Sequence, residues 1–201
     1  MARPRIVLAS SSPRRTALLR QIGIAHTVDP ATIDESIAPG TGATDAVLAL
    51  AEQKASVVAD RHRGLPVAVI GADTVVCIDD DILGKPGDAG EAIAMLHRLA
   101  GQTHEVHTGV CVVSHITGRT ATALTTTSVT LRPIDTGQIA AYVATGEPAD
   151  AAGAYAIQGR AAMFVDRIEG DYTNVVGLPL PVTVALLNDA GFDTVHAWAR
   201  G

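Results

Sequence analysis

The sequence predicts an α/β fold in which helices flank a mixed, partly antiparallel sheet. The segment Val67–Ile78 is apolar almost throughout, which is typical of a central strand covered on both faces. The segments Thr103–Ile116 and Thr120–Leu131 are rich in valine and threonine and flank the turn Thr117-Gly118-Arg119, as in a long antiparallel hairpin. Such a hairpin excludes a purely parallel sheet, and the intervening helical segments complete the α/β pattern.

The first helix begins in an unusual way. Ile6–Ala9 has the pattern of a short buried strand, and three serines lead from it to Pro13, at the first position of a helix with Ser12 as its N-cap. Arg14 and Arg15 follow in the first turn, where the helix dipole already favours anions, so they destabilise the turn by up to about 1 kcal/mol unless an anion binds. We interpret the stretch as a polyphosphate-binding turn; a capped helix with two solvated arginines is the alternative.

Periodicity and turn residues predict the remaining elements. Further strands are expected at Ala25–Val28, Ile82–Leu83 and Ala162–Ile168. Further helices are expected at Thr44–His62 with Thr44 as cap, from Asp88 as cap through Ala100, at Gln138–Ala144 behind Asp135, and at Pro181–Gly191. Loops are expected at Pro30–Gly42, Asp150–Gly159 and Asn174–Leu180, and Trp198 falls in a tail that we expect to be frayed.

Length, composition and charge limit the possible functions. With 201 residues the chain can form one domain, residues 1–201, or two closely associated lobes. The net charge of −6 disfavours a nucleic acid polymer as partner, although a free nucleotide would need only a local basic patch. Because no signal-peptide core and no run long enough for a bilayer occur, we expect a cytoplasmic protein with no membrane partner.

Asp73 is the carboxylate that most strongly suggests a function. It interrupts an apolar strand, and a buried carboxylate must be paired, bound to a metal or protonated. We predict that Asp73 faces a cleft, where it binds a divalent cation or polarises a water molecule. An aspartate that ends the strand and bonds a neighbouring backbone group is the alternative. Glu35, in a loop, is a candidate second metal ligand.

Other polar residues carry weaker signals. Lys54 and Lys85 would ordinarily be solvated, but Lys85 lies in the constrained segment Gly84-Lys85-Pro86, where a fixed cation could meet a phosphate. His104 and His107 are three residues apart on a strand and therefore on opposite faces, so we expect no shared metal. The two cysteines, Cys77 and Cys111, lie in apolar strands and are expected to be buried thiols.

Several segments, in order, resemble the Maf family of nucleoside triphosphate pyrophosphatases. They cover almost the whole chain: Leu8-Ala9-Ser10-Ser11-Ser12-Pro13-Arg14-Arg15, Asp34-Glu35, Glu52-Gln53-Lys54-Ala55, Gly71-Ala72-Asp73-Thr74-Val75-Val76, Gly84-Lys85-Pro86, Gly153-Ala154-Tyr155-Ala156-Ile157-Gln158-Gly159 and Asn174-Val175-Val176-Gly177-Leu178-Pro179-Leu180. The resemblance implies an ITPase-like fold of two lobes around a substrate cleft, and commonly a homodimer. It also implies hydrolysis between the α and β phosphates with a divalent cation, Mg²⁺ or Mn²⁺.

The same resemblance implies a role for each matching residue. Asp73 would accept the proton of the attacking water and, with Glu35, would hold the metal. The phosphates would be bound by Ser10, Ser12, Arg15, Lys54 and Lys85. Such a division is physically reasonable, because phosphoryl transfer depends on positioning and charge stabilisation more than on covalent chemistry.

Three positions distinguish the branches of the family. The branch that acts on dTTP and UTP has arginine, threonine and glutamine where this chain has Arg14, Thr74 and Gln158. The 7-methyl-GTP branch has tryptophan, glutamine and glutamate there. Glutamine offers a donor and an acceptor to a uracil or thymine edge, so we expect pyrimidine triphosphates as substrates.

Two alternatives and two departures accompany this assignment. The chain could act on 7-methyl-GTP, or it could be a nucleotide-binding inhibitor of division or septum formation without essential catalysis. Ala151 stands where family members often carry lysine, and Ala156 replaces a frequent glycine. The first could weaken a phosphate or pairing contact, and the second could tighten the loop around the base.

Overall fold

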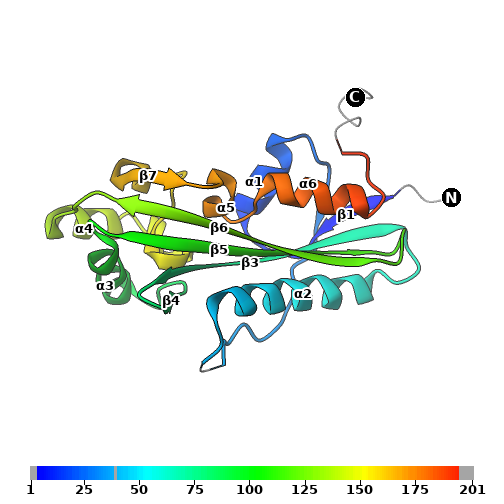
Figure 1. Cartoon of the computed structure of the whole chain (residues 1–201), viewed down its shortest axis with the longest axis horizontal. Coiled ribbons are helices and arrows are strands. Elements are labelled where there is room, and N and C mark those ends of the chain that lie inside the picture. Colours follow the sequence, from blue (N-terminus) through cyan, green and yellow to red (C-terminus); the bar gives the residue numbers. More distant parts are fainter. Residues whose placement is uncertain (1–3, 39, 195–201) are drawn as a thin grey trace. The chain divides into compact units, whose positions relative to one another are not determined.

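A computed structural model describes residues 4–38 and 40–194 (Figure 1); Trp198 therefore lies outside the described residues. In the described part, seven strands form one mixed sheet in the order β2-β1-β3-β5-β6-β7, with β4 paired to β3. The strands are β1 (Arg5–Leu8), β2 (Thr27–Val28), β3 (Val67–Ile78), β4 (Asp81–Leu83), β5 (Thr103–Ser114), β6 (Thr120–Leu131) and β7 (Val165–Glu169). The predicted fold class, a mixed sheet flanked by helices, is confirmed.

Helices connect these strands. The α-helices are α1 (Pro13–Gln21), α2 (Ala43–Arg61), α3 (Ala89–Leu99), α4 (Thr136–Val143), α5 (Tyr172–Val176) and α6 (Leu180–Asp189). Short 3₁₀ helices are η1 (Glu147–Asp150), η2 (Ala152–Ala154) and η3 (Arg160–Phe164). None of the helices in residues 4–38 and 40–194 is both long and apolar enough to cross a membrane.

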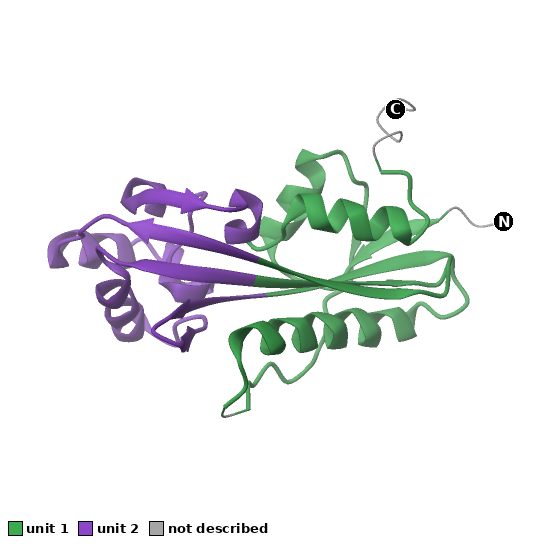
Figure 2. Cartoon of the chain, viewed as in Figure 1, with its two compact units in different colours: residues 1–73, 108–125, 177–201 green, residues 74–107, 126–176 purple. Residues whose placement is uncertain are grey.

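The chain divides into two compact units, coloured green and purple in Figure 2. Unit 1 comprises residues 1–73, 108–125 and 177–201, and unit 2 comprises residues 74–107 and 126–176. By these bounds β3, β5 and β6 each contribute residues to both units.

In unit 1, β1 pairs in parallel with β2 and β3, with Leu8 opposite Ile70. Two glycines let the α2 backbone lie directly against the sheet. A Cβ added at Gly71 would stand 2.2 Å from the carbonyl oxygen of Ala51, and one at Gly109 would stand 2.4 Å from that of Val47. This close approach fixes where the side chains of α2 meet the sheet.

In unit 2, β3 pairs antiparallel with β4, and β6 pairs antiparallel with β7. Helix α3 packs against α4, η1 and η2, and α4 also packs against η1. Both predicted acidic caps are confirmed. Asp88 accepts a hydrogen bond from the backbone of Glu91, and Asp135 forms a reciprocal capping box with Gln138.

Several predicted boundaries are wrong. Helix α2 begins at Ala43 with Gly42 as N-cap, so Thr44 lies in the first turn and is not the cap; glycine is tolerated at that position almost as well as threonine. The strand expected from Ala25 is reduced to β2, and the strand expected from Ala162 begins at Val165, because residues 160–164 form η3. The loop expected over 174–180 begins inside α5.

The two cysteines are free thiols, and only one is fully buried. Cys111 is buried as expected, and burial raises its pKa to about 12. Cys77 is only half-buried, so the prediction of a buried thiol is wrong for it. Burial and the nearby carboxylate of Asp80 raise the pKa of Cys77 above its usual value.

Candidate active site

A cluster of three charged side chains lies in unit 1. Lys54 Nζ donates a hydrogen bond to Asp73 Oδ1 at 2.6 Å and lies 3.1 Å from Glu35 Oε1. Lys54 and Asp73 are buried, with exposed fractions of 6% and 8%, whereas the side chain of Glu35 is 58% exposed. The cluster therefore connects a buried ion pair to a carboxylate in solvent.

The packing of α2 on β3 explains why Lys54 meets Asp73. Gly71 and Asp73 are two residues apart on β3, so they share one face of the strand. The Cβ direction of Gly71 points at Ala51 and Ala55 of α2, and Lys54 lies beside Ala55 on that helix. A buried carboxylate is expected to have a partner, and the partner of Asp73 is the side chain of Lys54.

The serine turn before α1 is organised by Arg15. Arg15 Nε donates to the carbonyl oxygen of Gly177 at 2.8 Å, and its Nη1 donates to Ser10 Oγ at 3.0 Å. The backbone N–H of Ser12 also donates to Ser10 Oγ, at 3.2 Å. Ser12 occupies the N-cap position, but its hydroxyl makes no capping bond. Arg15 is 9% exposed and Arg14 is half-buried, so the alternative of two solvated arginines does not hold.

Sheet pairing brings the turn and the buried ion pair to neighbouring positions in unit 1. Ala9 N–H donates to the carbonyl oxygen of Ile70 at 2.8 Å. Ser10 follows Ala9, and Asp73 lies three residues beyond Ile70 on the adjacent parallel strand. Hydroxyl, guanidinium, ammonium and carboxylate groups therefore gather near the carboxyl end of β1, an edge at which α/β sheets commonly bind ligands.

Unit 2 holds the remaining predicted residues. Thr74 follows Asp73 on β3 and is half-buried. Lys85 donates to Asp150 Oδ1, and the two side chains are 62% and 53% exposed. Gln158 is exposed in a tight turn closed by a hydrogen bond from the N–H of Gly159 to the carbonyl oxygen of Ala156 at 2.9 Å. Asp150 could not be predicted as the partner of Lys85, because a surface aspartate carries no local sequence signal of a partner 65 residues away.

The donor set in unit 1 suits a hard divalent cation. Among the described residues, no group of three or more His, Cys, Asp or Glu side chains could hold a metal ion. Magnesium, however, is usually bound by one or two carboxylates and completes its shell with water and substrate phosphates. Asp73 and Glu35, which both approach Lys54, supply two such carboxylates.

The two buried histidines of β5 take part in the packing of unit 2. His104 Nε2 lies 2.8 Å from the hydroxyl of Tyr155, and His107 Nδ1 lies 2.9 Å from Thr126 Oγ1. Burial lowers the pKa of His104 to about 4. His104 is therefore a neutral structural residue at neutral pH.

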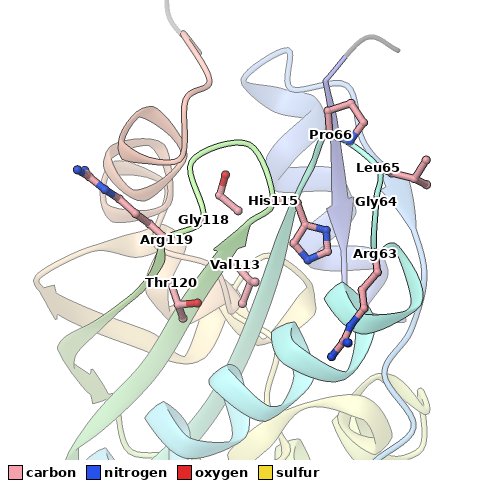
Figure 3. A pocket seen from close by; sticks show the side chains of 10 residues that line it. Arg63, Gly64, Leu65, Pro66, Val113, His115, Gly118, Arg119 and Thr120 are labelled. Atoms are coloured by element: carbon pink, nitrogen blue, oxygen red, sulfur yellow. The ribbon is translucent and has the colours of Figure 1, made fainter. Parts of the chain in front are cut away.

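A separate hollow of about 610 Å³ lies near the start of β3 (Figure 3). It is lined by Arg63–Pro66, Val113–His115 and Gly118–Thr120. Figure 3 shows His115 between Arg63 and Arg119, and the guanidinium of Arg63 donates twice to Asp60 Oδ1. Since β3 rises about 3.3 Å per residue, Pro66 and Asp73 are roughly 20 Å apart along the strand, and the hollow is distinct from the charged cluster.

The chain is similar to known proteins over most of its length. The dTTP/UTP pyrophosphatase of Methylobacillus flagellatus is 49% identical over 187 residues, which cover 93% of each chain. Those of Myxococcus xanthus and Moorella thermoacetica are 50% and 48% identical and cover 92% and 98% of each chain. The match to the solved structure of the Staphylococcus aureus Ham1 protein covers 64% of this chain and 72% of that chain, at 13% identity and a TM-score of 0.42.

The family model described as "Maf-like protein" matches residues 5–190. The match includes the serine–arginine turn, the buried Lys54–Asp73 pair and the loop that carries Gln158. The chain belongs to the Maf-like protein family.

Proposed function

We propose that this protein is a nucleoside triphosphate pyrophosphatase that converts dTTP and UTP to the monophosphate and pyrophosphate. The observation that carries the proposal is the buried Lys54–Asp73 pair beside the Ser10–Arg15 turn. The relatives named dTTP/UTP pyrophosphatase, at 48–50% identity over most of the chain, support the same activity.

The charged groups divide into those that bind phosphates and one that acts on water. The cationic side chains Arg15, Lys54 and Lys85, with the hydroxyls of Ser10 and Ser12, bind the triphosphate through charge-assisted hydrogen bonds. Asp73 accepts a proton from water as the water oxygen attacks phosphorus. The bond between the α phosphorus and the bridging oxygen breaks, and pyrophosphate leaves. Lys54 holds the carboxylate of Asp73 in place and adds positive charge beside it.

A divalent cation, Mg²⁺ or Mn²⁺, belongs to this proposal. Asp73 and Glu35 would hold it, because carboxylate oxygens are the ligands these ions prefer. When bound, such an ion neutralises charge that develops on the phosphates. Glu35 is the more exposed of the two carboxylates and is therefore the one that can approach an ion from solvent.

Base recognition is assigned to three residues. Arg14, Thr74 and Gln158 match the residue types of the branch that acts on dTTP and UTP. Gln158 is exposed and can offer both a donor and an acceptor to a uracil or thymine edge. A cationic 7-methylguanine would be favoured by a carboxylate at that position, which this chain does not have.

Two further assignments follow from the substrate and the family. We assign the protein to the cytoplasm because its proposed substrates are the nucleotides that serve nucleic acid synthesis there. We also propose the homodimer that the family resemblance implies, which analytical ultracentrifugation of the full chain tests directly.

A nucleotide panel with product analysis tests the function. Purified protein is incubated with Mg²⁺ and UTP, dTTP, CTP, GTP or 7-methyl-GTP, and the products are separated by ion-exchange chromatography. We expect UMP or dTMP together with pyrophosphate. Release of orthophosphate would overturn the assigned bond, and faster turnover of 7-methyl-GTP than of UTP would overturn the assigned base. Binding of UTP without turnover would favour a nucleotide-responsive inhibitor of division.

A further inference from the structure

The turn that carries Gln158 is exposed at its tip and buried on its N-terminal side. Ala156 and Ile157 are each 5% exposed, whereas Gln158 is exposed. Tyr155, just before the turn, is buried, and its hydroxyl lies 2.8 Å from His104 Nε2. Gln158 is therefore presented to solvent by a backbone that is held in the core of unit 2.

The hydroxyl of Tyr142 holds the beginning of the turn. It accepts a hydrogen bond from the N–H of Ala156 at 3.1 Å and donates its own proton to Glu147 Oε1 at 3.0 Å. Tyr142 is 4% exposed. Its ring packs edge-on against Phe164, with 5.4 Å between the ring centres, so the hydroxyl cannot move without moving the core.

The carboxylate of Glu147 holds the end of the turn. Its Oε2 accepts from the N–H of Arg160 at 3.1 Å, and its Oε1 accepts from the N–H of Ala161 at 3.3 Å. These are the first two N–H groups of η3, where a negative charge is favourable. The backbone of Gly159 lies so close that an added Cβ would stand 2.5 Å from Glu147 Oε1.

Gln158 thus lies between two anchors that meet at one carboxylate. Ala156 is tied to Glu147 through Tyr142, and Arg160 and Ala161 are tied to it directly. These hydrogen bonds act on the backbone at either side of Gln158. A hydrogen bond to a base edge depends on the position of that amide to within a fraction of an ångström, and misplacement by about 1 Å can cost about 100-fold in rate.

We propose that Tyr142 and Glu147 are positioning residues that set base specificity by fixing the Gln158 turn. The proposal rests on the pyrophosphatase function and deepens it. The base is discriminated by Gln158, but the precision of the discrimination comes from the tyrosine hydroxyl and the carboxylate behind it. A purely structural role would change stability and leave the preference among bases unaltered.

Two conservative variants test whether Tyr142 and Glu147 set base specificity. Tyr142→Phe removes one oxygen atom and keeps the ring packing, and Glu147→Gln replaces one carboxylate oxygen by an NH2 group, which donates hydrogen bonds and cannot accept them. The measured quantity is the ratio of kcat/KM for UTP to that for CTP, with KM and kcat followed separately. We expect each variant to lower this ratio by about tenfold, mainly through a higher KM for UTP.

Matched controls come from the same unit. Tyr172→Phe alters an exposed tyrosine of α5, and Glu169→Gln alters an exposed glutamate of β7. Both should leave the ratio within about twofold of the wild type, as expected for surface substitutions. Gln158→Ala gives the decrease in the UTP/CTP ratio that follows when the base contact itself is removed. The double variant Gln158→Ala/Tyr142→Phe should show no larger decrease than Gln158→Ala alone, because both changes remove the same interaction.

The outcomes separate this proposal from the function it rests on. If the wild type releases no pyrophosphate from UTP, the proposed function fails before any variant is measured. If the wild type is active and both variants keep its UTP/CTP ratio while their Tm falls, the positioning role is wrong. Should Glu147→Gln fail to fold, Tyr142→Phe gives the same readout with the core packing retained.

Discussion

The two units of this protein each contain a lysine–aspartate pair, and the two pairs differ in burial. In unit 1, Lys54 and Asp73 are 6% and 8% exposed, and a second carboxylate, that of Glu35, approaches the same ammonium. In unit 2, the side chains of Lys85 and Asp150 are both more than half exposed. A pair in water contributes at most about 1 kcal/mol, whereas a buried pair is costly to form and still costlier to break.

The two units differ in how they hold their proposed functional groups. Unit 1 concentrates buried charge at Asp73 and Lys54, which suits a reaction that needs a base and a polyphosphate. Unit 2 holds the Gln158 turn mainly through backbone N–H groups, which suits the recognition of a base edge. Both units contain a lysine–aspartate pair, so the burial of the pair in unit 1 is what distinguishes the proposed catalytic position.

The largest expected effect comes from removing the ammonium of the buried pair. Lys54→Met leaves Asp73 buried and uncompensated, so we expect the free energy of unfolding to fall by about 3–5 kcal/mol. Pyrophosphate release should fall by about 100-fold or more. Urea unfolding and steady-state kinetics measure the two effects.

Lys85→Met is the matched control in unit 2. Because the Lys85–Asp150 pair is exposed, its loss should change the free energy of unfolding by less than about 1 kcal/mol. Equal destabilisation by the two substitutions would contradict the distinction drawn from burial.

A smaller effect is expected in acid, where unit 2 buries a titratable group in its neutral form. Burial lowers the pKa of His104 from 6.5 to about 4, so the unfolded chain binds more protons than the fold between these values. The contribution of neutral His104 to the free energy of unfolding is therefore fully present above pH 6.5. As the pH falls towards 4, the free energy of unfolding decreases by up to about 3 kcal/mol.

His104→Gln isolates this contribution, because glutamine can still bond the hydroxyl of Tyr155 and does not titrate. The wild type should lose stability relative to this variant as the pH falls from 6.5 to 4, as measured by urea unfolding at several pH values. Parallel pH profiles for the two proteins would refute the assignment to His104.

The next smaller effect concerns the glycines beside the two lysine sites. At Gly71 a Cβ would meet the backbone of α2, whereas at Gly84, next to Lys85, it would meet nothing within 4 Å. Gly71→Ala should therefore destabilise by about 1–3 kcal/mol and displace Lys54. Gly84→Ala should be neutral or stabilise by up to about 1 kcal/mol. Thermal unfolding of the two variants measures this difference. Equal Tm values would show that α2 can move away from Gly71 without loss of stability.

Local signals in the sequence were sufficient for much of the fold. The bounds of β3 and the caps Asp88 and Asp135 are as predicted, because each depends on residues at most three apart or on one apolar run. Thr44 is not the cap, and the reason is also local: helix α2 already begins at Ala43. Gly42 ends an extended segment and accepts the first helical hydrogen bond, from the N–H of Ala46.

The sequence was less informative about which groups meet. That Asp73 needs a partner follows from its burial, but the identity of Lys54 as that partner depends on the approach of α2 over Gly71. Arg15 bonds the backbone of Gly177, 162 residues away. Glu147 lies in a polar segment with no distinctive pattern, and only the folded chain shows that it binds the N–H groups of Arg160 and Ala161.

The catalytic role of Asp73 is tested most directly by the kcat of Asp73→Asn with UTP under saturating Mg²⁺. UTP binding is measured on the same sample by calorimetry. Asparagine keeps the size of the side chain and removes its capacity to accept a proton, so kcat should fall by at least about 100-fold while UTP remains bound. Pyrophosphate release at the wild-type rate would contradict the mechanism.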